Sequence, residues 1–337
     1  MKYQLLGNTG VYVSRFCLGT MTFGGRGIPP YDQIGGLNQA EIQDVVNAAL
    51  DSGINFIDTA DVYAQGESEE LLGKAISSRR NDLVLATKFH APVGRGPNQR
   101  GQSRLHMMQA LENSLRRLQT DHIDLYQIHN FDPLTPFEET LRALDDAVRQ
   151  GKIRYIGCSN LAAWQAMKAL GISERNGLER FVSIQAYYSL AGRDIEYELL
   201  PLIEDQKMGL MVWSPLAAGF LSGKYDRHTE QGLSRRDKFE FPPINRERVF
   251  DIIDVLRLVA QRHSATPAQI ALAWLLAKPA VTSVITGVRR VDQLHDNMAA
   301  LELRLSPEDI AELDAISEPG LHYPNWIQAN WANNRIP

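Results

Sequence analysis

Four side chains suited to proton transfer stand at or just after the ends of three consecutive apolar runs of the chain. Asp58 ends the first run and Tyr63 lies five residues beyond it, while Lys88 ends the second run and His129 ends the third. Taken singly, each has an ordinary role as a turn carboxylate, a loop aromatic, a surface lysine or a core histidine. Their occurrence together at neighbouring strand ends indicates one shared site.

Together, the four could act as an acid. A free tyrosine has a pKa of about 10, which makes it a weak proton donor near pH 7 unless its surroundings help. An ammonium group such as that of Lys88 favours the phenolate and lowers this pKa, and the Asp58 carboxylate would hold the ammonium in place. His129 could orient a carbonyl oxygen through a hydrogen bond. The set suits protonation of an oxygen that becomes negative as a carbonyl is reduced.

Along the chain that carries these residues, two patterns alternate. Short apolar runs rich in β-branched residues are followed by longer segments whose apolar residues recur every three or four positions. The expected strands are Phe16–Gly19, Asn55–Asp58, Leu83–Lys88, Ile123–His129, Tyr155–Ser159, Phe181–Gln185, Gly209–Trp213 and Ser283–Thr286. Helices are expected near 39–52, 67–78, 103–119, 137–150, 161–170, 194–207, 246–263, 267–277, 291–301 and 307–316. Eight strand–helix units predict a (β/α)8 TIM barrel of the α/β class, with its active site at the carboxyl ends of the strands.

Three of the expected helix starts carry capping signals. Asn38 stands three residues before Glu41, as an N-cap and its reciprocal partner do. Thr266-Pro267 and Ser306-Pro307 each place a capping hydroxyl before a proline at the first helical position. These residues therefore predict where the three helices begin.

A doubly wound open sheet is the alternative fold, and it would carry a G-x-G-x-x-G turn after its first strand. The segments 24–27 and 94–96 are rich in glycine but do not fit that pattern. A chain of 337 residues could form two domains, yet no linker, repeat or low-complexity segment divides it. We expect one domain over residues 1–337, with a long loop at about 217–245 and a C-terminal tail at about 318–337.

Composition narrows the class of protein. The formal net charge is −5, from 35 Lys and Arg against 40 Asp and Glu, which disfavours sequence-independent binding to nucleic acid. Cys17 and Cys158 both lie in apolar runs, as buried reduced thiols do in cytosolic proteins. The first residues lack an apolar signal-peptide core, and no run approaches the roughly 18 to 20 apolar residues of a membrane span. We expect a cytoplasmic protein without membrane insertion.

Other classes of site are not supported by the residues. The segment Gly219–Lys224 is one residue short of a Walker phosphate loop and is followed by Tyr225. No spacing of His, Cys and carboxylates suggests zinc, so we expect no metal site. The interleaved aromatic and basic residues of a protein that binds single-stranded nucleic acid are missing.

Five ordered segments resemble the aldo-keto reductases, and the resemblance runs along nearly the whole chain. They are Leu18–Gly24, Asn55–Ala60 with Tyr63 after it, Asp124–His129, Gly151–Asn160 and Trp213–Leu216. The long loop before the last strand resembles the branch that holds bacterial aldehyde and sugar reductases and the potassium-channel β subunits. The resemblance implies that Tyr63 is the general acid and that Lys88 lowers its pKa. It also implies that Asp58 pairs with Lys88 and that His129 orients the substrate.

The resemblance further implies a nicotinamide cofactor that supplies the hydride directly, without a metal. Matching motifs place the carboxamide at Ser159, Asn160 and Gln185, with the nicotinamide ring stacked on Trp213. Residues of the long loop would hold the pyrophosphate, and those after the last strand would hold the adenosine. These are Ser214, Leu216 and Lys224 in the loop and Gly287, Arg289, Gln293, Asp296 and Asn297 after the strand; Thr20 and Met21 complete the set. Tyr225 and one of Arg235 and Arg236 are further loop candidates.

Arg289 underlies the expectation of NADPH rather than NADH. A helix N-terminus with an arginine nearby suits the 2′-phosphate of NADP. Many family members carry an arginine where Gln293 stands and a lysine where Gly287 stands. The expected preference for NADPH/NADP therefore leaves NADH open.

The resulting hypothesis is NADPH-dependent reduction of aldehydes and ketones to alcohols, with sugar-derived and aromatic aldehydes as candidate substrates. Two alternatives stay open. The site could run in reverse as an NADP-dependent alcohol or sugar dehydrogenase, or the chain could be a slow, cofactor-binding regulatory or redox-sensing subunit. The aromatic tail segment His322–Trp331 could stack over the barrel mouth or staple the barrel wall. No motif indicates an oligomeric state.

Overall fold

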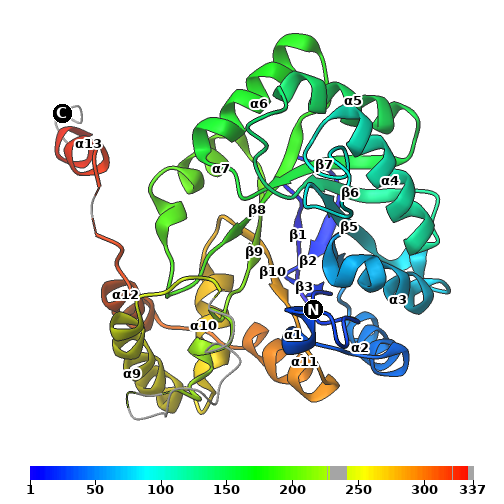
Figure 1. Cartoon of the computed structure of the whole chain (residues 1–337). Helices are drawn as coiled ribbons and strands as arrows, with labels where there is room; N and C mark the ends of the chain where they lie inside the picture. The colour runs from blue at the N-terminus through cyan, green and yellow to red at the C-terminus, as the bar shows by residue number, and fades with distance from the viewer. Residues whose placement is uncertain (226, 228–240, 321, 333–337) are drawn as a thin grey trace.

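The centre of the molecule is a closed barrel of parallel strands surrounded by helices (Figure 1). The computed structural model describes residues 1–225, 227, 241–320 and 322–332. In barrel order the strands are β3 (Phe16–Gly19), β4 (Phe56–Asp58), β5 (Val84–Phe89), β6 (Ile123–Ile128), β7 (Ile153–Ser159), β8 (Phe181–Tyr187), β9 (Gly209–Trp213) and β10 (Val281–Thr286). Because β10 pairs with β3, the barrel closes, and the predicted (β/α)8 fold is confirmed.

Four strands extend beyond their predicted ends, and the smallest change is in β5, which reaches Phe89, one residue past Lys88. β7 begins at Ile153 rather than Tyr155, because Ile153 pairs with Ile123 of the neighbouring strand although the exposed Arg154 breaks the apolar run. β8 continues to Tyr187, which pairs with Trp213. β10 begins two residues earlier than expected, at Val281. Pairing with a neighbouring strand therefore lengthens strands beyond the apolar run that marks them in the sequence.

An antiparallel hairpin, β1 (Tyr3–Leu5) and β2 (Tyr12–Ser14), precedes the barrel and was not predicted. Its strands are three residues each, too short for an alternating pattern to stand out. Leu6 and Val13 of this hairpin join the apolar cluster inside the barrel. Asn55, just before β4, accepts a hydrogen bond from the peptide N–H of Ser14 at 2.7 Å and ties the hairpin to the barrel.

The outer helices alternate with the strands as predicted. They are α2 (Gln39–Asp51), α3 (Glu67–Ile76), α4 (Arg104–Leu118), α5 (Phe137–Arg149), α6 (Ala163–Asn176), α7 (Leu199–Gln206), α9 (Arg246–Arg262), α10 (Pro267–Ala277), α11 (Val291–Met298) and α12 (Pro307–Ile316). Two short helices, α1 (Tyr31–Ile34) and α13 (Asn325–Ala332), were not predicted. Single 3-10 turns form η1 (Tyr63–Gly66), η2 (Arg80–Asp82), η3 (Asp194–Glu196), η4 (Phe220–Ser222) and η5 (Ala299–Leu301).

Capping boxes at α2, α10 and α12 confirm the three predicted helix starts. Two other predicted helices differ from the structure. The helix expected at 194–207 is interrupted, because Pro201 is tolerated only in a first turn and α7 therefore begins at Leu199. The helix expected at 161–170 continues through Gly171 to Asn176, since a glycine inside a packed helix weakens it without ending it.

The structure describes the long loop and the C-terminal tail only in part. Within 217–245 the structure describes 217–225, 227 and 241–245, so Arg235 and Arg236 lie outside the described residues. Figure 1 shows α13 outside the ring of helices and away from the barrel mouth. Trp326 and Trp331 on α13 are 45% and 65% exposed. One of the two sequence-based alternatives placed these rings over the barrel mouth. The described tail does not hold them there.

Candidate active site

Asp58 and Lys88 form a buried ion pair at the carboxyl ends of β4 and β5. The Lys88 ammonium donates to Asp58 Oδ2 at 2.5 Å and to the carbonyl of Thr59 at 2.8 Å. The relative exposure of the two side chains is 0% for Lys88 and 3% for Asp58. A buried charge must be paired and hydrogen-bonded to be tolerated, and each partner meets that need for the other.

Tyr63 reaches the same ammonium from the turn η1 that follows β4. Lys88 Nζ lies 3.3 Å from the phenolic oxygen and 5.0 Å from the centre of the ring. Ala64 and Gln65, the next two residues, both adopt left-handed backbone conformations, with φ of 49° and 58°. Such conformations are uncommon outside glycine and persist only where the surroundings hold them. The turn thus aims the Tyr63 hydroxyl at the ion pair.

The second oxygen of Asp58 is held by two amides. Gln127 Nε2 donates to Asp58 Oδ1 at 3.1 Å and Gln185 Nε2 donates to the same oxygen at 2.9 Å. Gln127 was not singled out from the sequence, although a polar residue inside the apolar run 123–128 was a signal for it. Gly157 makes room beside it, because a Cβ there would lie 3.2 Å from Gln127 Cγ. Both amides therefore fix the carboxylate that faces Lys88.

Burial, rather than the lysine, sets the direction of the Tyr63 pKa. Burial raises this pKa, the Lys88 ammonium opposes the rise, and the Asp58 carboxylate adds to it, so the net value is raised. Lys88 therefore lowers the Tyr63 pKa, as expected from the sequence, but burial raises it by more. For Lys88, burial lowers the pKa, but Asp58 and Tyr63 more than restore it, so the net value is raised. At neutral pH the site therefore holds a protonated phenol beside an ammonium.

His129 stands against the same tyrosine just beyond the end of β6. The two rings meet edge to face with centroids 5.9 Å apart and planes at 77°. Burial lowers the pKa of His129 well below its usual value, and the charges of Lys88 and His90 lower it further. The imidazole is therefore neutral at physiological pH. It can exchange a hydrogen bond with a ligand oxygen without acting as a charged acid.

Three residues predicted to bind the nicotinamide carboxamide lie at the ends of β7 and β8, next to the catalytic candidates. Asn160, in a left-handed conformation with φ of 55°, donates from Nδ2 to the carbonyl of His129 at 3.0 Å. Ser159 Oγ donates to the carbonyl of Gln185 at 3.0 Å. Since Gln185 also holds Asp58, these positions and the buried ion pair form one connected network.

Trp213, predicted to stack on the nicotinamide, is already in contact with two aromatic rings. Its Nε1 donates to Asn160 Oδ1 at 3.1 Å. Phe241, at the end of the long loop, lies parallel to the indole with centroids 5.4 Å apart and planes at 3°. Tyr187 lies 5.1 Å away, tilted by 33°. A ring that stacks on the face covered by Phe241 must displace that side chain. Neither Phe241 nor Tyr187 was predicted to be part of the site.

The predicted pyrophosphate residues follow Trp213 in an unusual backbone. Ser214, Ala217 and Ala218 adopt left-handed conformations with φ of 51°, 48° and 56°, and Ser214 Oγ accepts from the N–H of Ala218 at 3.0 Å. Strained backbone of this kind clusters at ligand-binding turns. Leu216 is partly buried and Lys224 is exposed.

The predicted adenosine end lies between β10 and α11. The guanidinium of Arg289 donates only to backbone carbonyls of α1, and within the described part of the chain it forms no ion pair with a carboxylate. The backbone N–H of Arg289 donates to Gln293 Oε1 at 2.9 Å. Asp296 Oδ1 accepts from Gln269 Nε2 at 2.8 Å. An uncompensated guanidinium beside a helix N-terminus fits a phosphate monoester.

The remaining predicted residues flank these groups in different ways. The Thr20 hydroxyl is fully buried and lies 3.0 Å from Ser68 Oγ, so its side chain is engaged with α3. Met21 is partly exposed. Gly287 is exposed, and Asn297 is partly buried on α11. These assignments stay predictions.

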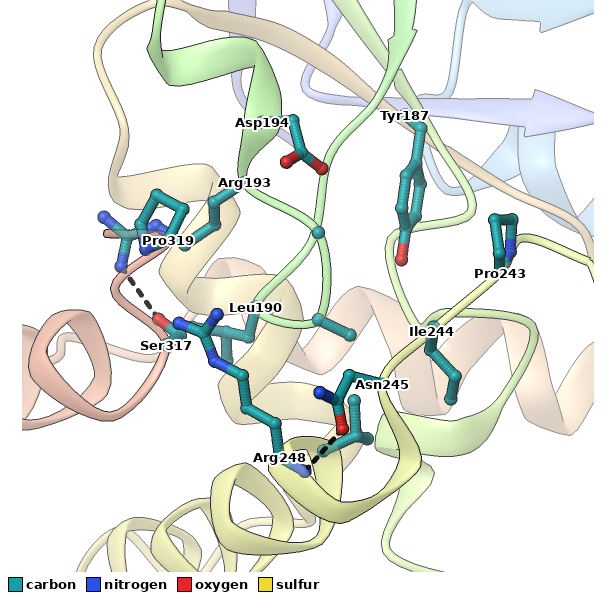
Figure 2. Close-up of a pocket in the computed structure, with 13 residues that line it drawn as sticks. Tyr187, Leu190, Arg193, Asp194, Pro243, Ile244, Asn245, Arg248, Ser317 and Pro319 are labelled. Atoms are coloured by element: carbon teal, nitrogen blue, oxygen red, sulfur yellow. Dashed lines mark hydrogen bonds between the residues drawn. The ribbon is translucent and has the colours of Figure 1, made fainter. Parts of the chain in front are cut away.

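A separate cavity of about 340 Å³ lies behind Tyr187, between the segment that follows β8, the start of α9 and the residues after α12 (Figure 2). Arg193, Asn245 and Arg248 line it, and none of the four catalytic candidates does. Arg193 is already bonded to Glu196 and Ser317. The cavity therefore neighbours the site through Tyr187 and is not part of it.

Over the residues that the structure describes, no three His, Cys, Asp or Glu side chains gather as metal ligands would. In the same part of the chain, every helix is too short or too polar to cross a membrane.

Comparison with known proteins identifies relatives along almost the entire chain. The model of the aldo/keto reductase family matches residues 15–318. An uncharacterised oxidoreductase of Bacillus subtilis (strain 168), YrpG, is 39% identical over 96% of this chain and 98% of its own length. The "Probable voltage-gated potassium channel subunit beta" of Oryza sativa subsp. japonica is 36% identical over 94% of this chain and 96% of its own. Versiconal hemiacetal acetate reductase of Aspergillus parasiticus is 34% identical over 96% of this chain and 99% of its own.

Proposed function

The chain belongs to the aldo/keto reductase family and is an oxidoreductase of carbonyl groups, and from this premise we propose that it reduces aldehydes and ketones with NADPH, using Tyr63 as the general acid. The observation that carries the proposal is the contact of the Tyr63 hydroxyl with the buried Lys88–Asp58 pair, at 3.3 Å from Lys88 Nζ. A bound nicotinamide supplies the hydride, while the protein supplies position and electrostatics.

In this proposal the phenol of Tyr63 gives its proton to the carbonyl oxygen as that oxygen becomes negative. The phenolate that remains faces the Lys88 ammonium, whose charge stabilises it in a site of low dielectric. Asp58 keeps the ammonium charged and in place. Neutral His129 donates a hydrogen bond that orients the carbonyl oxygen. The carboxamide of the cofactor would be held by Ser159, Asn160 and Gln185.

Spectrophotometry of NADPH oxidation with aromatic, aliphatic and sugar aldehydes tests the activity itself. We expect turnover with some members of the panel and tight binding of NADPH. Tight binding with no turnover on any aldehyde, ketone or, in reverse, alcohol would contradict the proposal.

A raised Tyr63 pKa has a consequence for the pH dependence of reduction. Reduction needs the protonated phenol, so the rate should stay level through neutral pH and fall as the pH rises through the Tyr63 pKa, above the usual value of about 10. The reverse oxidation needs the phenolate and should rise over the same range. A profile of kcat against pH in both directions measures this. If the rate of reduction already begins to fall below pH 8 as the pH is raised, the assignment is contradicted.

NADPH preference is proposed to reside in Arg289. Arg289→Ala removes one charge-assisted contact with the 2′-phosphate and should weaken NADPH binding by roughly 10- to 100-fold, with NADH changed by less than about threefold. Arg290→Ala, which removes a neighbouring arginine paired with Asp292, is the matched control. Fluorescence titration of both cofactors decides the point. Equal weakening of NADPH and NADH would place the 2′-phosphate elsewhere.

Aromatic aldehydes are the substrate class that the surroundings of the site support best. The rings of Tyr63, His129, Trp213 and Phe241 lie at or beside the proposed reacting groups, and aromatic rings favour contact with one another. Sugar-derived aldehydes would also stack on such rings. One relative, by its name, reduces versiconal hemiacetal acetate.

A second candidate function is a slow, cofactor-binding regulatory subunit, favoured by the similarity to the rice protein named for a potassium channel. Such a subunit would keep the nicotinamide site and reduce carbonyls slowly while bound to a membrane partner. Rapid multiple turnover without any partner would exclude this role as the main one.

We also propose that the chain acts as one domain and works in the cytoplasm. The barrel uses strands from Phe16 to Thr286, which supports a single unit. Cys17 and Cys158 are buried and unpaired, as expected in a reducing compartment.

A further inference from the structure

The short helix α1 receives three hydrogen bonds from Arg289. The guanidinium Nε donates to the carbonyl of Ile34 at 3.0 Å, and Nη2 donates to the carbonyls of Gln33 at 2.8 Å and Ile34 at 2.7 Å. Arg289 is exposed, yet its guanidinium donates three hydrogen bonds to a single helical turn. The turn is therefore joined to the segment between β10 and α11, where the adenosine end of the cofactor is proposed to bind.

The same turn reaches the catalytic tyrosine through Tyr31. The Tyr31 hydroxyl donates to the carbonyl of Val62 at 3.0 Å, and Val62 directly precedes Tyr63. Burial raises the pKa of Tyr31 to about 12, with smaller contributions from Tyr63 and Asp61, so the phenol remains a donor at all physiological pH values. Tyr31 and Gln33 are two positions apart in the chain, so both contacts are made by the same helical turn.

Glycine at position 25 lets Tyr31 take this place. A Cβ on Gly25 would lie 2.4 Å from Tyr31 Cβ, and Gly25 has a left-handed φ of 82°. Its N–H donates to Glu67 Oε2 at 2.7 Å, at the start of α3 just after the turn η1. The loop that carries α1 is thus attached on both sides of the turn that holds Tyr63, at Val62 and at Glu67.

We propose that α1 links the adenosine end of the cofactor site to the Tyr63 turn, and that Tyr31 is a positioning residue for Tyr63. The inference rests on the proposed roles of Tyr63 and Arg289. Its physical basis is the strain of η1, in which Ala64 and Gln65 keep left-handed conformations only while their surroundings hold them. Loss of either attachment of α1 lets the turn relax and moves the phenol away from Lys88.

Hydrogen exchange in the cofactor-free protein tests the link without any catalysis. Tyr31→Phe and Arg289→Ala should each speed amide exchange in peptides covering residues 60–67 by about threefold or more, because each removes a restraint on the turn. Tyr12→Phe, at a tyrosine 61% exposed on the hairpin, and Arg290→Ala should leave that exchange unchanged. Unchanged exchange at 60–67 in either Tyr31→Phe or Arg289→Ala would overturn the link.

Steady-state kinetics then test whether Tyr31 positions Tyr63. Tyr31→Phe should lower kcat about fivefold to tenfold at saturating cofactor and substrate and leave the NADPH Kd within about twofold, since the lost hydrogen bond touches neither ligand. Adding Arg289→Ala should lower kcat little further, because both substitutions release the same turn. Multiplicative effects on kcat, or a Tyr31→Phe kcat within twofold of wild type, would overturn the proposal. Lack of wild-type turnover would instead count against the proposed function, and the exchange result would still decide the link.

Discussion

Tyr63→Phe should lower kcat for aldehyde reduction by roughly 10²- to 10⁴-fold while leaving the NADPH Kd within about twofold. The substitution removes the proton donor and keeps the ring that packs edge to face on His129. Because no predicted cofactor contact involves the hydroxyl, binding should be preserved. Steady-state rates from NADPH absorbance and a fluorescence titration of NADPH measure the two effects.

Tyr12→Phe provides the matched control, since it removes a phenolic hydroxyl at the opposite, hairpin end of the barrel. Its kcat should equal that of the wild type. A Tyr63→Phe variant that keeps a tenth or more of the wild-type rate would show that another group gives the proton. A parallel loss of NADPH binding would show that the hydroxyl serves the cofactor instead.

Lys88→Met should impair both stability and catalysis. It leaves the Asp58 carboxylate buried with only the amides of Gln127 and Gln185, and breaking a buried pair in this way costs about 3–5 kcal/mol of unfolding free energy. It also removes the charge that stabilises the Tyr63 phenolate, so kcat should fall by two orders of magnitude or more, within the range of general acid catalysis. Chemical denaturation and steady-state kinetics report the two losses separately.

The double substitution Asp58→Asn with Lys88→Met separates these losses. A neutral amide at position 58 removes the unpaired charge, so most of the lost stability should return while kcat stays low. A double variant as unstable as Lys88→Met alone would show that packing, rather than the unpaired carboxylate, causes the destabilisation.

The barrel could be predicted because its signals are local. β-branched runs, helical periodicity and capping residues such as Asn38 lie within a few positions of the elements they specify. The hairpin before β3 escaped prediction because its short strands are stabilised by the packing of Leu6 and Val13 against the barrel interior rather than by a pattern of their own. Pro201 is the opposite case, because proline is tolerated only in the first turn of a helix and so marks locally where α7 begins.

The residues of the site that could be predicted are those at strand ends and in family motifs. Asp58, Lys88 and Tyr63 come together because parallel strands bring their carboxyl ends to one edge. The hydrogen bond from Gln127 to Asp58 joins residues 69 positions apart in the chain, and no local pattern encodes such a contact. The raised pKa of Tyr63 depends on burial, which a list of charged neighbours does not reveal. The contacts of Arg289 with α1 were not foreseen because they too join residues far apart in the chain, 255 positions for Arg289 and Ile34.

The central claim is that this barrel transfers hydride from NADPH to a carbonyl carbon beside Tyr63. Its most direct test uses NADPH deuterated at C4 of the nicotinamide, in two preparations with the label on opposite faces, and an aldehyde that the enzyme reduces. Mass spectrometry of the alcohol should find the deuterium on the carbinol carbon with one preparation and not with the other. Deuterium absent from the alcohol with both preparations, or released to water, would contradict direct hydride transfer and with it the proposed function.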